Sequence, residues 1–183
     1  MNKKINQTMT QSLAVLALSA AVSVPMQATA GCNPFVAMTT PDEAFSINNN
    51  GTVTHNETGL MWKVCAEGQT WNNDGTCTGS ASEMTWQQAL QQPQTVNTSG
   101  GYAGYADWRL PNIKELSSIA EMACFGPALN STIFDSAPPQ PFWSSSPISQ
   151  LTNQSWVVHF DRGNVTEQMR TGSWHLRLVR NVQ

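Results

Sequence analysis

The sequence is poor in charged residues and lacks the short motifs that mark common catalytic and metal sites. No His-x-x-x-His or Cys-x-x-Cys spacing occurs, so the usual zinc sites are excluded. No Gly-x-Ser-x-Gly motif surrounds Ser144–Ser146, the densest run of serines, which excludes a nucleophile elbow there. Internal repeats, heptads and low-complexity runs are also missing, which argues against a repeat protein.

Basic residues are too few for a general nucleic-acid-binding protein. Nine Lys and Arg face twelve Asp and Glu, and the first thirty residues hold two of the lysines and no acid. Residues 31–183 therefore carry seven positive and twelve negative charges, a net charge of −5. The charge is uneven, because residues 156–183 contain four arginines and two acids, a net of +2.

A long hydrophobic run is missing as well, and the apolar stretch near the N-terminus is too short to span a membrane stably. Lys3 and Lys4 precede the apolar stretch Ser12–Met26, and Ala28–Ala30 follows as a small-x-small cleavage site. We therefore predict a signal peptide over residues 1–30 and an exported domain that is periplasmic, secreted or on the cell surface. The alternative is a lipoprotein, in which Cys32 after Ala30-Gly31 would be acylated.

All four cysteines lie beyond the predicted signal peptide, and an even number in an exported chain predicts two disulfides. Four cysteines allow three pairings, and the sequence alone does not choose among them. The loop lengths favour Cys65–Cys77, which would staple a polar segment with little core of its own. Cys32–Cys124 would then tie the N-terminal arm to a distant segment, and acylation of Cys32 would leave an odd number of thiols.

The alternation of apolar and polar residues predicts an α+β fold, a compact single domain with two helices, short antiparallel strands and long loops. Capping-box patterns begin both predicted helices, a short one after Thr85 and one after Asn112 whose apolar stripe runs from Ile113 to Ala123. The predicted strands are a hairpin in Phe45–Cys65, a strand at Phe142–Ser146, a second hairpin from Ser155–Phe160 and Val165–Arg170, and a terminal strand at Trp174–Val182.

The stretch Asp107, Trp108, Arg109, Leu110 and Pro111 predicts a corner between a strand and a helix. Pro111 disfavours a helical conformation at the preceding residue, so the chain is extended up to the N-cap. Arg109 has two interpretations: it contacts a ligand carboxylate or sulfate, or it binds carbonyls near the helix start or a nearby acid. The second is favoured, which makes the corner architectural.

Trp71 and the polar turn behind it form the first candidate ligand site. Six of the seven tryptophans lie in predicted elements and are expected in the core, whereas Trp71 lies in a polar loop and could stack on a sugar ring. Asn72, Asn73 and Asp74 group oxygen atoms that suit calcium, a ligand set that ordinary turn chemistry explains equally well. No other cofactor is predicted.

The C-terminal arginines are the second candidate site. A basic patch from Arg162, Arg170, Arg177 and Arg180 would suit a sulfated or uronic-acid glycan. Arg177 and Arg180 are three residues apart and so point to opposite faces of a regular strand, which means that they need neighbours to form a patch. The alternative is that these arginines are solvated strand charges.

Several motifs together resemble one family, the Lcl C-terminal-like domain. These are TGLMW (58–62), CAEGQTW (65–71), TWQQAL (85–90), DWRLPNIKEL (107–116), FWSSS (142–146) and HLRLVR (175–180). The resemblance spans about Ala44–Asn181, which predicts an N-terminal arm at 31–43 and the domain at 44–183. The Trp-Arg-Leu-Pro corner is also similar to that of C-type-lectin-like and sulfatase-modifying-factor folds.

The resemblance implies an exported, non-enzymatic binding or adhesion module, because the family is named after a bacterial collagen-like adhesin whose C-terminal module binds host and sulfated glycans. The chain has no Gly-X-Y stalk, so adhesion that needs such a stalk does not transfer. No catalytic set comes with the family. The alternative is a structural or protein-interaction subunit of a surface or pilus-like assembly, with a protein partner or an oligomer in place of a glycan.

Overall fold

Residues 31–182 of the computed structural model form an α+β fold of two α-helices and short antiparallel strands, as the sequence predicts. The predicted signal peptide, residues 1–30, lies outside the described residues. Within residues 31–182, no helix is both long and apolar enough to cross a membrane. The elements are β1 (Gly31–Cys32), a 3-10 helix (Asp42–Ala44), β2 (Phe45–Ile47), β3 (Thr52–His55), β4 (Leu60–Lys63), β5 (Thr70–Trp71), β6 (Cys77–Thr78), α1 (Trp86–Thr98), α2 (Ile113–Ser117), β7 (Cys124–Phe125), β8 (Pro141–Pro147), β9 (Gln154–His159), β10 (Asn164–Met169) and β11 (Val179–Asn181).

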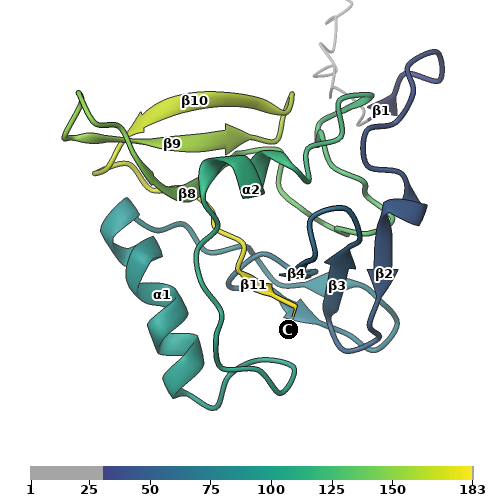
Figure 1. Ribbon diagram of the computed structural model, residues 1–183, viewed down its shortest axis with the longest axis horizontal. Helices are drawn as coiled ribbons and strands as arrows, with labels where there is room; N and C mark the ends of the chain where they lie inside the picture. The colour runs from purple at the N-terminus through teal and green to yellow at the C-terminus, as the bar shows by residue number, and fades with distance from the viewer. Residues whose placement is uncertain (1–30, 183) are drawn as a thin grey trace, which may run out of the picture.

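The first main sheet has the strand order β11-β4-β3-β2 and lies in the lower part of Figure 1. The sequence predicts one hairpin over Phe45–Cys65, but the structure has a three-stranded meander there, because β2 adds a strand beside β3. β11 pairs antiparallel with β4, with Val179 opposite Trp62. The C-terminal strand therefore completes a sheet that begins near the N-terminal arm.

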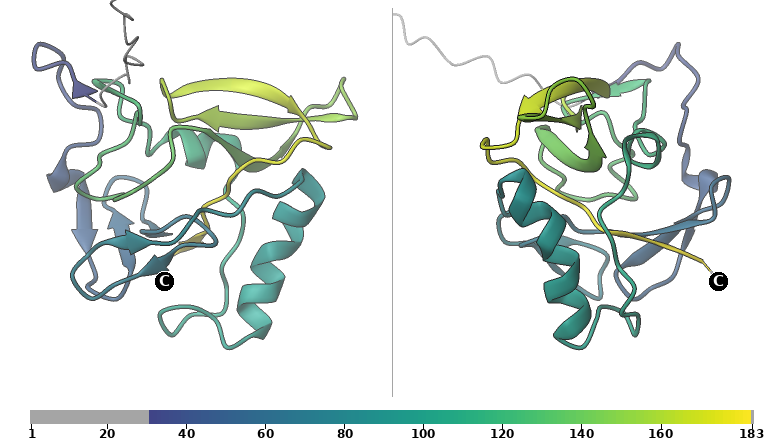
Figure 2. Two further views of the ribbon diagram at one scale, coloured as in Figure 1. Left: turned by 180° about the vertical axis from the view of Figure 1, so that it is seen from behind. Right: turned by 60° about the vertical axis from the view of Figure 1, so that its left-hand side comes forward.

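The second main sheet, with the order β10-β9-β8, lies at the top of Figure 1 and in both views of Figure 2. β9 and β10 form the predicted hairpin, with Asn164 opposite His159. β8 contains the strand predicted at Phe142–Ser146. The predicted terminal strand at Trp174–Val182 is shorter than expected, because only its end joins a ladder and its first residues make isolated bridges.

Helix α1 lies at the left of Figure 1 and begins at the predicted capping box. The Gln88 N–H donates to Thr85 Oγ1 (3.4 Å), and the Thr85 N–H donates to Gln88 Oε1 (2.9 Å). The helix runs for 13 residues and is longer than predicted. Pro93 lies inside it on the buried side, where its missing N–H removes one helical hydrogen bond.

Helix α2 packs on β8 and β9 and is shorter than its apolar stripe predicts. It begins at the predicted capping box of Asn112 and Glu115 and ends after 5 residues. The Ser118 N–H donates to two carbonyls, those of Lys114 and Glu115, which tightens the last turn. Ile119, Ala120 and Ala123 of the stripe are buried outside any helix, so their burial was predicted correctly and their helical conformation was not, whereas Met122 is exposed.

Three of the six tryptophans that the sequence assigns to the core are fully buried. Trp62, Trp108 and Trp143 are 0–2% exposed. The other three tryptophans in predicted elements, Trp86, Trp156 and Trp174, are half-buried. The buried apolar residues form two clusters, and both contain residues from the two main sheets: Trp62 and Phe142 belong to the first, and Met61 and Trp143 to the second. The loops that carry the candidate site are attached to the first cluster.

Both disulfides pair as the loop lengths favour, Cys32 with Cys124 and Cys65 with Cys77. The first joins β1 to β7 and fixes the N-terminal arm. The Cys32 sulfur is bonded to Cys124 and is therefore not available for a lipid, which is a finding against the lipoprotein alternative. The second disulfide joins the end of β4 to β6.

A buried carboxylate also holds the N-terminal arm. Glu121 is 0% exposed and accepts hydrogen bonds from the backbone N–H groups of Thr39 (3.0 Å), Thr40 (2.7 Å) and Ala123 (2.8 Å). Burial acts to raise the pKa of Glu121, but these hydrogen bonds outweigh burial and the pKa lies below its ordinary value. The arm is therefore part of the folded body.

Candidate functional site

The Asp107–Pro111 corner is built around a buried tryptophan. The Trp108 backbone N–H donates to Asn97 Oδ1 (3.0 Å), and Asn97 Nδ2 donates back to the Trp108 carbonyl (2.8 Å). The indole N–H donates to the Tyr102 carbonyl (3.1 Å). Leu110 and Pro111 are buried beside it. The Trp108 ring is therefore buried, and its indole N–H and backbone polar groups are hydrogen-bonded within the fold.

Arg109 takes the structural role that the sequence favours. Its two terminal nitrogens donate to the two carboxylate oxygens of Glu115 (2.7 and 2.8 Å), and Nη2 also donates to Asn181 Oδ1 (2.8 Å). Burial acts to raise the pKa of Glu115, but the hydrogen bonds from Arg109 and Asn112 lower it below its ordinary value. The pair ties the start of α2 to the C-terminal strand.

Arg177, a predicted member of the basic patch, lies in the core. Its side chain is 0% exposed, donates to the carbonyls of Lys63 (2.9 Å) and Val64, and lies over the Phe134 ring at 4.6 Å. Burial lowers the pKa of Arg177 to about 9, while the Glu67 carboxylate acts in the opposite direction. This arginine cannot contact a surface ligand.

The predicted basic patch is therefore wrong as a single surface. Arg180 is also buried, where it pairs with Asp107 through two hydrogen bonds (2.7 and 3.1 Å) and holds the pKa of that carboxyl below its ordinary value. Arg162 is highly exposed and lies 3.4 Å from Asp161. Strand alternation predicts one solvated face, but the C-terminal strand is covered on both faces, so its arginines are internal.

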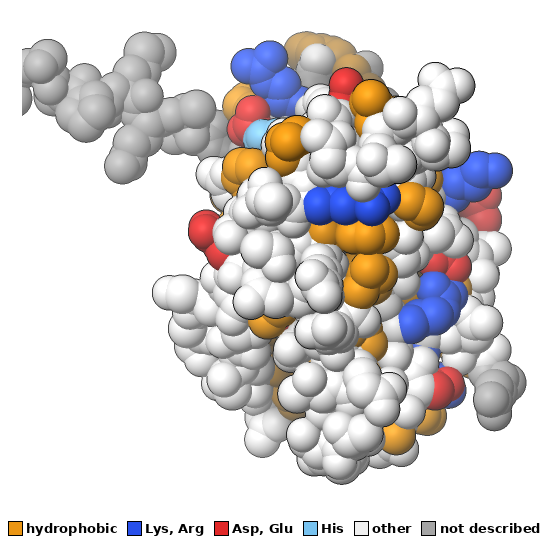
Figure 3. All heavy atoms as spheres, turned by 90° about the vertical axis from the view of Figure 1, so that its left-hand side faces the viewer, with side chains coloured by type: hydrophobic (Ala, Val, Ile, Leu, Met, Phe, Trp, Pro, Cys, Tyr) orange, Lys and Arg blue, Asp and Glu red, His pale blue; other side chains and the backbone are white. Residues whose placement is uncertain are grey.

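Arg170, another arginine of the predicted patch, lines a groove of the described surface. Its Nε donates to the Gln154 carbonyl (3.1 Å) and to Ser155 Oγ (2.8 Å), and its guanidinium lies 4.1 Å over the Trp86 ring. The groove measures about 410 Å³ and is lined by Thr85, Trp86, Gln87, Leu90, Arg170 and Thr171. The face carrying α1 is toward the viewer in Figure 3, where a strip of hydrophobic side chains is crossed by a basic one.

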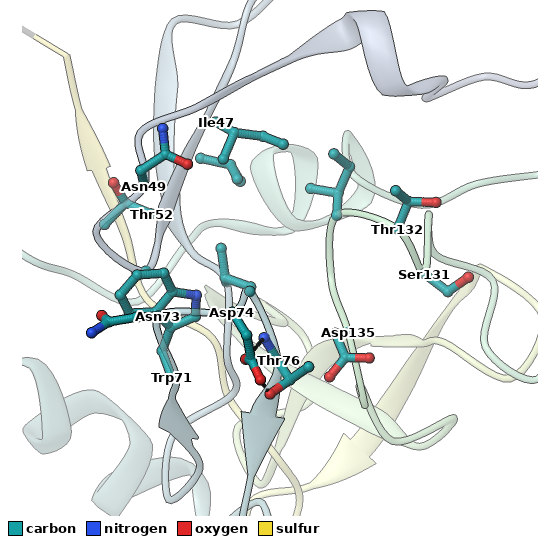
Figure 4. A pocket seen from close by; sticks show the side chains of 15 residues that line it. Ile47, Asn49, Thr52, Trp71, Asn73, Asp74, Thr76, Ser131, Thr132 and Asp135 are labelled. Atoms are coloured by element: carbon teal, nitrogen blue, oxygen red, sulfur yellow. Dashed lines mark hydrogen bonds between the residues drawn. The ribbon is translucent and has the colours of Figure 1, made fainter.

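Trp71 lies in a different place, in a cavity of about 530 Å³ formed by three loops. Figure 4 shows its labelled side chains, which come from the β2–β3 hairpin, the β5–β6 hairpin and the loop before β8. Its lining includes the buried apolar residues Val53, Val64 and Ile133, several polar side chains and the half-buried indole. The lining residues are Ile47, Asn49, Gly51, Thr52, Val53, Val64, Trp71, Asn73, Asp74, Gly75, Thr76, Ser131, Thr132, Ile133 and Asp135.

Cys77 positions two sides of this cavity at once. It lies opposite Trp71 in the β5–β6 ladder, and its disulfide to Cys65 fixes that ladder to the end of β4. Its backbone N–H donates to Asp135 Oδ2 (2.9 Å), which holds the loop before β8 in place. One buried cysteine therefore connects the indole, the core and the distant carboxylate.

Gly51 lets the indole lie directly against the β2–β3 loop. Its φ of +81° is a left-handed conformation that side chains rarely adopt. A Cβ there would lie 3.1 Å from two atoms of the Trp71 ring and 2.0 Å from Tyr102 Oη, which donates to the Gly51 carbonyl (3.3 Å). A larger residue at this position would have to displace the cavity wall.

The Asn72–Asp74 segment forms the turn that the sequence offers as its alternative to a calcium site. Asp74 Oδ1 accepts from the Thr76 N–H (3.0 Å) and from Thr76 Oγ1 (2.7 Å), and the second of these bonds does most to hold the pKa of Asp74 below its ordinary value. Asn72 Nδ2 donates to Thr76 Oγ1 (3.0 Å). Asn73 and Asp74 line the cavity and Asn72 does not.

Sequence reasoning missed the polar residues that the β2–β3 loop and the loop before β8 contribute to the cavity. Asn49, Ser131, Thr132 and Asp135 carry no motif, and three of them lie in a proline-rich stretch without periodicity. Only tertiary contacts place these residues at the site. Asp135, for example, is held there by a hydrogen bond from the backbone of Cys77, 58 residues away. Calcium binding remains a sequence prediction, and no cluster of three or more His, Cys, Asp or Glu side chains suited to a metal is present in residues 31–182.

Comparison with known families gives one match. The model of the Lcl C-terminal domain family matches residues 51–180, which is more than two thirds of the chain. The matched range includes all of the β5–β6 hairpin and the loop before β8, and it begins inside the β2–β3 loop. No curated protein matches the sequence.

Proposed function

The chain belongs to the Lcl C-terminal domain family, and on that premise we propose that it is an exported, non-enzymatic binding module that recognises a saccharide in the Trp71 cavity. Two disulfides fit an oxidising compartment outside the cytosol. The family supports an interaction module at the surface. That the ligand is a saccharide is a more specific proposal than an interaction module, and the Trp71 cavity supports it.

The observation that carries the proposal is an indole beside polar side chains in one concave site. Trp71 offers an aromatic face for the C–H face of a sugar ring, and Asn73 and Thr76 lie next to it in the same hairpin. Asn49 and Thr132 approach from the other two loops. A volume of about 530 Å³ falls in the usual range of small-ligand pockets, roughly 300 to 1,000 Å³.

An acidic or sulfated saccharide fits this cavity poorly. Asp74 and Asp135 line it, and none of its lining residues is basic. None of the arginines that favoured a sulfated ligand lines the cavity, because Arg177 and Arg180 are buried, Arg162 is exposed beside Asp161 and Arg170 lies in a separate groove. We therefore assign the Trp71 cavity to a saccharide without negative charge.

A glycan array with the oxidised protein, followed by calorimetric titration of the best oligosaccharide, tests the proposal. Trp71→Ala is expected to weaken binding at least about tenfold, because it removes the aromatic platform. Arg170→Ala is the matched control in the other groove and should bind like the unmodified protein. An array without specific binding, or affinity that survives Trp71→Ala and falls with Arg170→Ala, would contradict the assignment.

The alternative, a protein-interaction or structural subunit, is favoured by a separate observation. A mostly apolar groove of about 570 Å³ runs between α2 and the β9–β10 hairpin and is lined by Ile113, Lys114, Ser117, Ser118, Trp156 and Val165. β10 is the edge strand of its sheet among the described residues, and both Val165 and Met169 are more than 40% exposed. No specific binding on the glycan array, together with reproducible oligomers in crosslinking, would favour this alternative.

A further inference from the structure

The Trp71 cavity holds two negative charges that no described cation neutralises. Asp74 lies in the β5–β6 turn and Asp135 in the loop before β8, and both line the cavity. Every ion pair between described residues involves other acids, namely Glu67, Glu115, Asp161 and Asp107. The negative charge of the lining residues therefore disfavours the binding of anions in this cavity.

In each of the two carboxylates, one oxygen accepts hydrogen bonds from the protein and the other accepts none from the described residues. Asp74 Oδ1 accepts both bonds from Thr76, and Asp135 Oδ2 accepts from the Cys77 N–H (2.9 Å) and from Ser136 Oγ (2.8 Å). No described residue donates to Asp74 Oδ2 or Asp135 Oδ1. The side chains are therefore oriented by the protein and still have acceptor capacity for a ligand.

The indole lies in the same cavity as these acceptors. Trp71, Asp74 and Asp135 all line this cavity, and in the view of Figure 4 Asp74 and Thr76 lie between Trp71 and Asp135. An aromatic face attracts cations through its quadrupole, and a carboxylate attracts them through its charge. A ligand that combines an apolar ring face with a positive group would meet both features at once.

We propose that the saccharide bound in the Trp71 cavity is an amino sugar with a free, protonated amine, which the carboxylates of Asp74 and Asp135 hold while the sugar ring stacks on Trp71. This inference rests on the proposed saccharide function and names the ligand class of that site. A neutral sugar would leave both carboxylates without a cation, and an acidic one would add a third negative charge.

The ionisation of Asp74 agrees with this assignment. The hydroxyl of Thr76 is the main cause that lowers the pKa of Asp74, so this carboxyl is ionised well below neutral pH. Asn73, next to it in the turn, is exposed and lines the cavity, where its amide can bind a sugar hydroxyl. The hydroxyl-binding and amine-binding groups are therefore adjacent.

The test compares an oligosaccharide of glucosamine with its N-acetylated counterpart, which has the same ring and no charge. Titration at about pH 6, where the amine is protonated, should give at least about tenfold tighter binding for the amine form. The preference should shrink in Asp74→Asn and Asp135→Asn and with rising salt. Asp161→Asn removes a carboxylate outside the cavity and should leave the preference unchanged. Asparagine keeps an oxygen acceptor, so both cavity variants retain their turn and loop contacts.

The outcomes separate this inference from the function on which it rests. Equal binding of the two oligosaccharides, lowered in both cases by Trp71→Ala, would overturn the amine assignment and leave saccharide recognition standing. A preference that persists in both asparagine variants would also overturn it, as would binding that requires added Ca²⁺, because the carboxylates would then serve a metal. Binding of neither oligosaccharide would contradict both proposals for these sugars.

Discussion

Removing the Cys65–Cys77 disulfide should affect both stability and ligand binding, whereas removing Cys32–Cys124 should affect stability alone. The first disulfide closes a loop with a sequence separation of 12 and anchors the hairpin of Trp71. In the chain-entropy model this closure contributes about 3 kcal/mol to the free energy of unfolding. The second closes a separation of 92 at the N-terminal arm, for which the same model gives about 4.7 kcal/mol.

The double variant Cys65→Ala/Cys77→Ala is expected to lose about 3 kcal/mol in urea unfolding. The β5–β6 ladder then has no disulfide to the end of β4, so Trp71 and, through the backbone N–H at position 77, Asp135 are held less firmly. Saccharide affinity should fall at least about tenfold under conditions where the variant is still folded. Calorimetric titration and intrinsic fluorescence measure the two effects on the same sample.

The matched control is Cys32→Ala/Cys124→Ala, which removes the same chemical bond at the N-terminal arm. Its unfolding free energy should fall by up to about 4.7 kcal/mol, and its saccharide affinity should stay unchanged while it is folded. If Cys65→Ala/Cys77→Ala keeps full affinity, the cavity is not organised through Cys77. If both variants lose affinity equally, the loss reflects general loosening and the reasoning is refuted.

Two further substitutions test the frame of the site. Glu121→Gln replaces Oε2, which accepts from the backbone N–H and the hydroxyl of Thr40, by an amide nitrogen, and losing these two charge-assisted hydrogen bonds should cost about 3 kcal/mol in urea unfolding at about pH 7. Because the folded-state pKa of Glu121 is depressed, its contribution is present above the ordinary pKa and is lost as pH falls through the folded value, so the two proteins should converge in strong acid. Gly51→Ala should cost about 1 to 2 kcal/mol for its left-handed backbone alone and should weaken saccharide binding by displacing Trp71; unchanged affinity would show that the indole does not depend on this contact.

Local signals in the sequence predict the elements well. The capping boxes at Thr85 and Asn112 begin helices where expected, because their hydrogen bonds lie within four residues. The end of α2 was not predictable in the same way. An apolar stripe only requires burial, and the turn after Ser118 buries Ile119 without helix.

Only part of the candidate site was predictable from the sequence, because local patterns do not encode tertiary contacts. Trp71 and Asp74 can be recognised in the sequence as an aromatic residue and an acidic turn residue within one polar loop. Asp135 joins them through a backbone hydrogen bond from Cys77 that no local pattern encodes. The arginine prediction failed because alternation assumes a solvated face, while Arg177 lies in a strand-like segment covered on both sides.

The central claim, that the Trp71 cavity is the binding site, is tested most directly by NMR titration of the ¹⁵N-labelled, oxidised protein with glucosamine and N-acetylglucosamine oligosaccharides in turn. The account predicts that the indole N–H signal of Trp71 shifts and saturates together with the amide signals of Asn73 and Asp135. Saturating shifts that cluster at Trp86 and Arg170, or at Trp156, while the Trp71 signals stay still would contradict it.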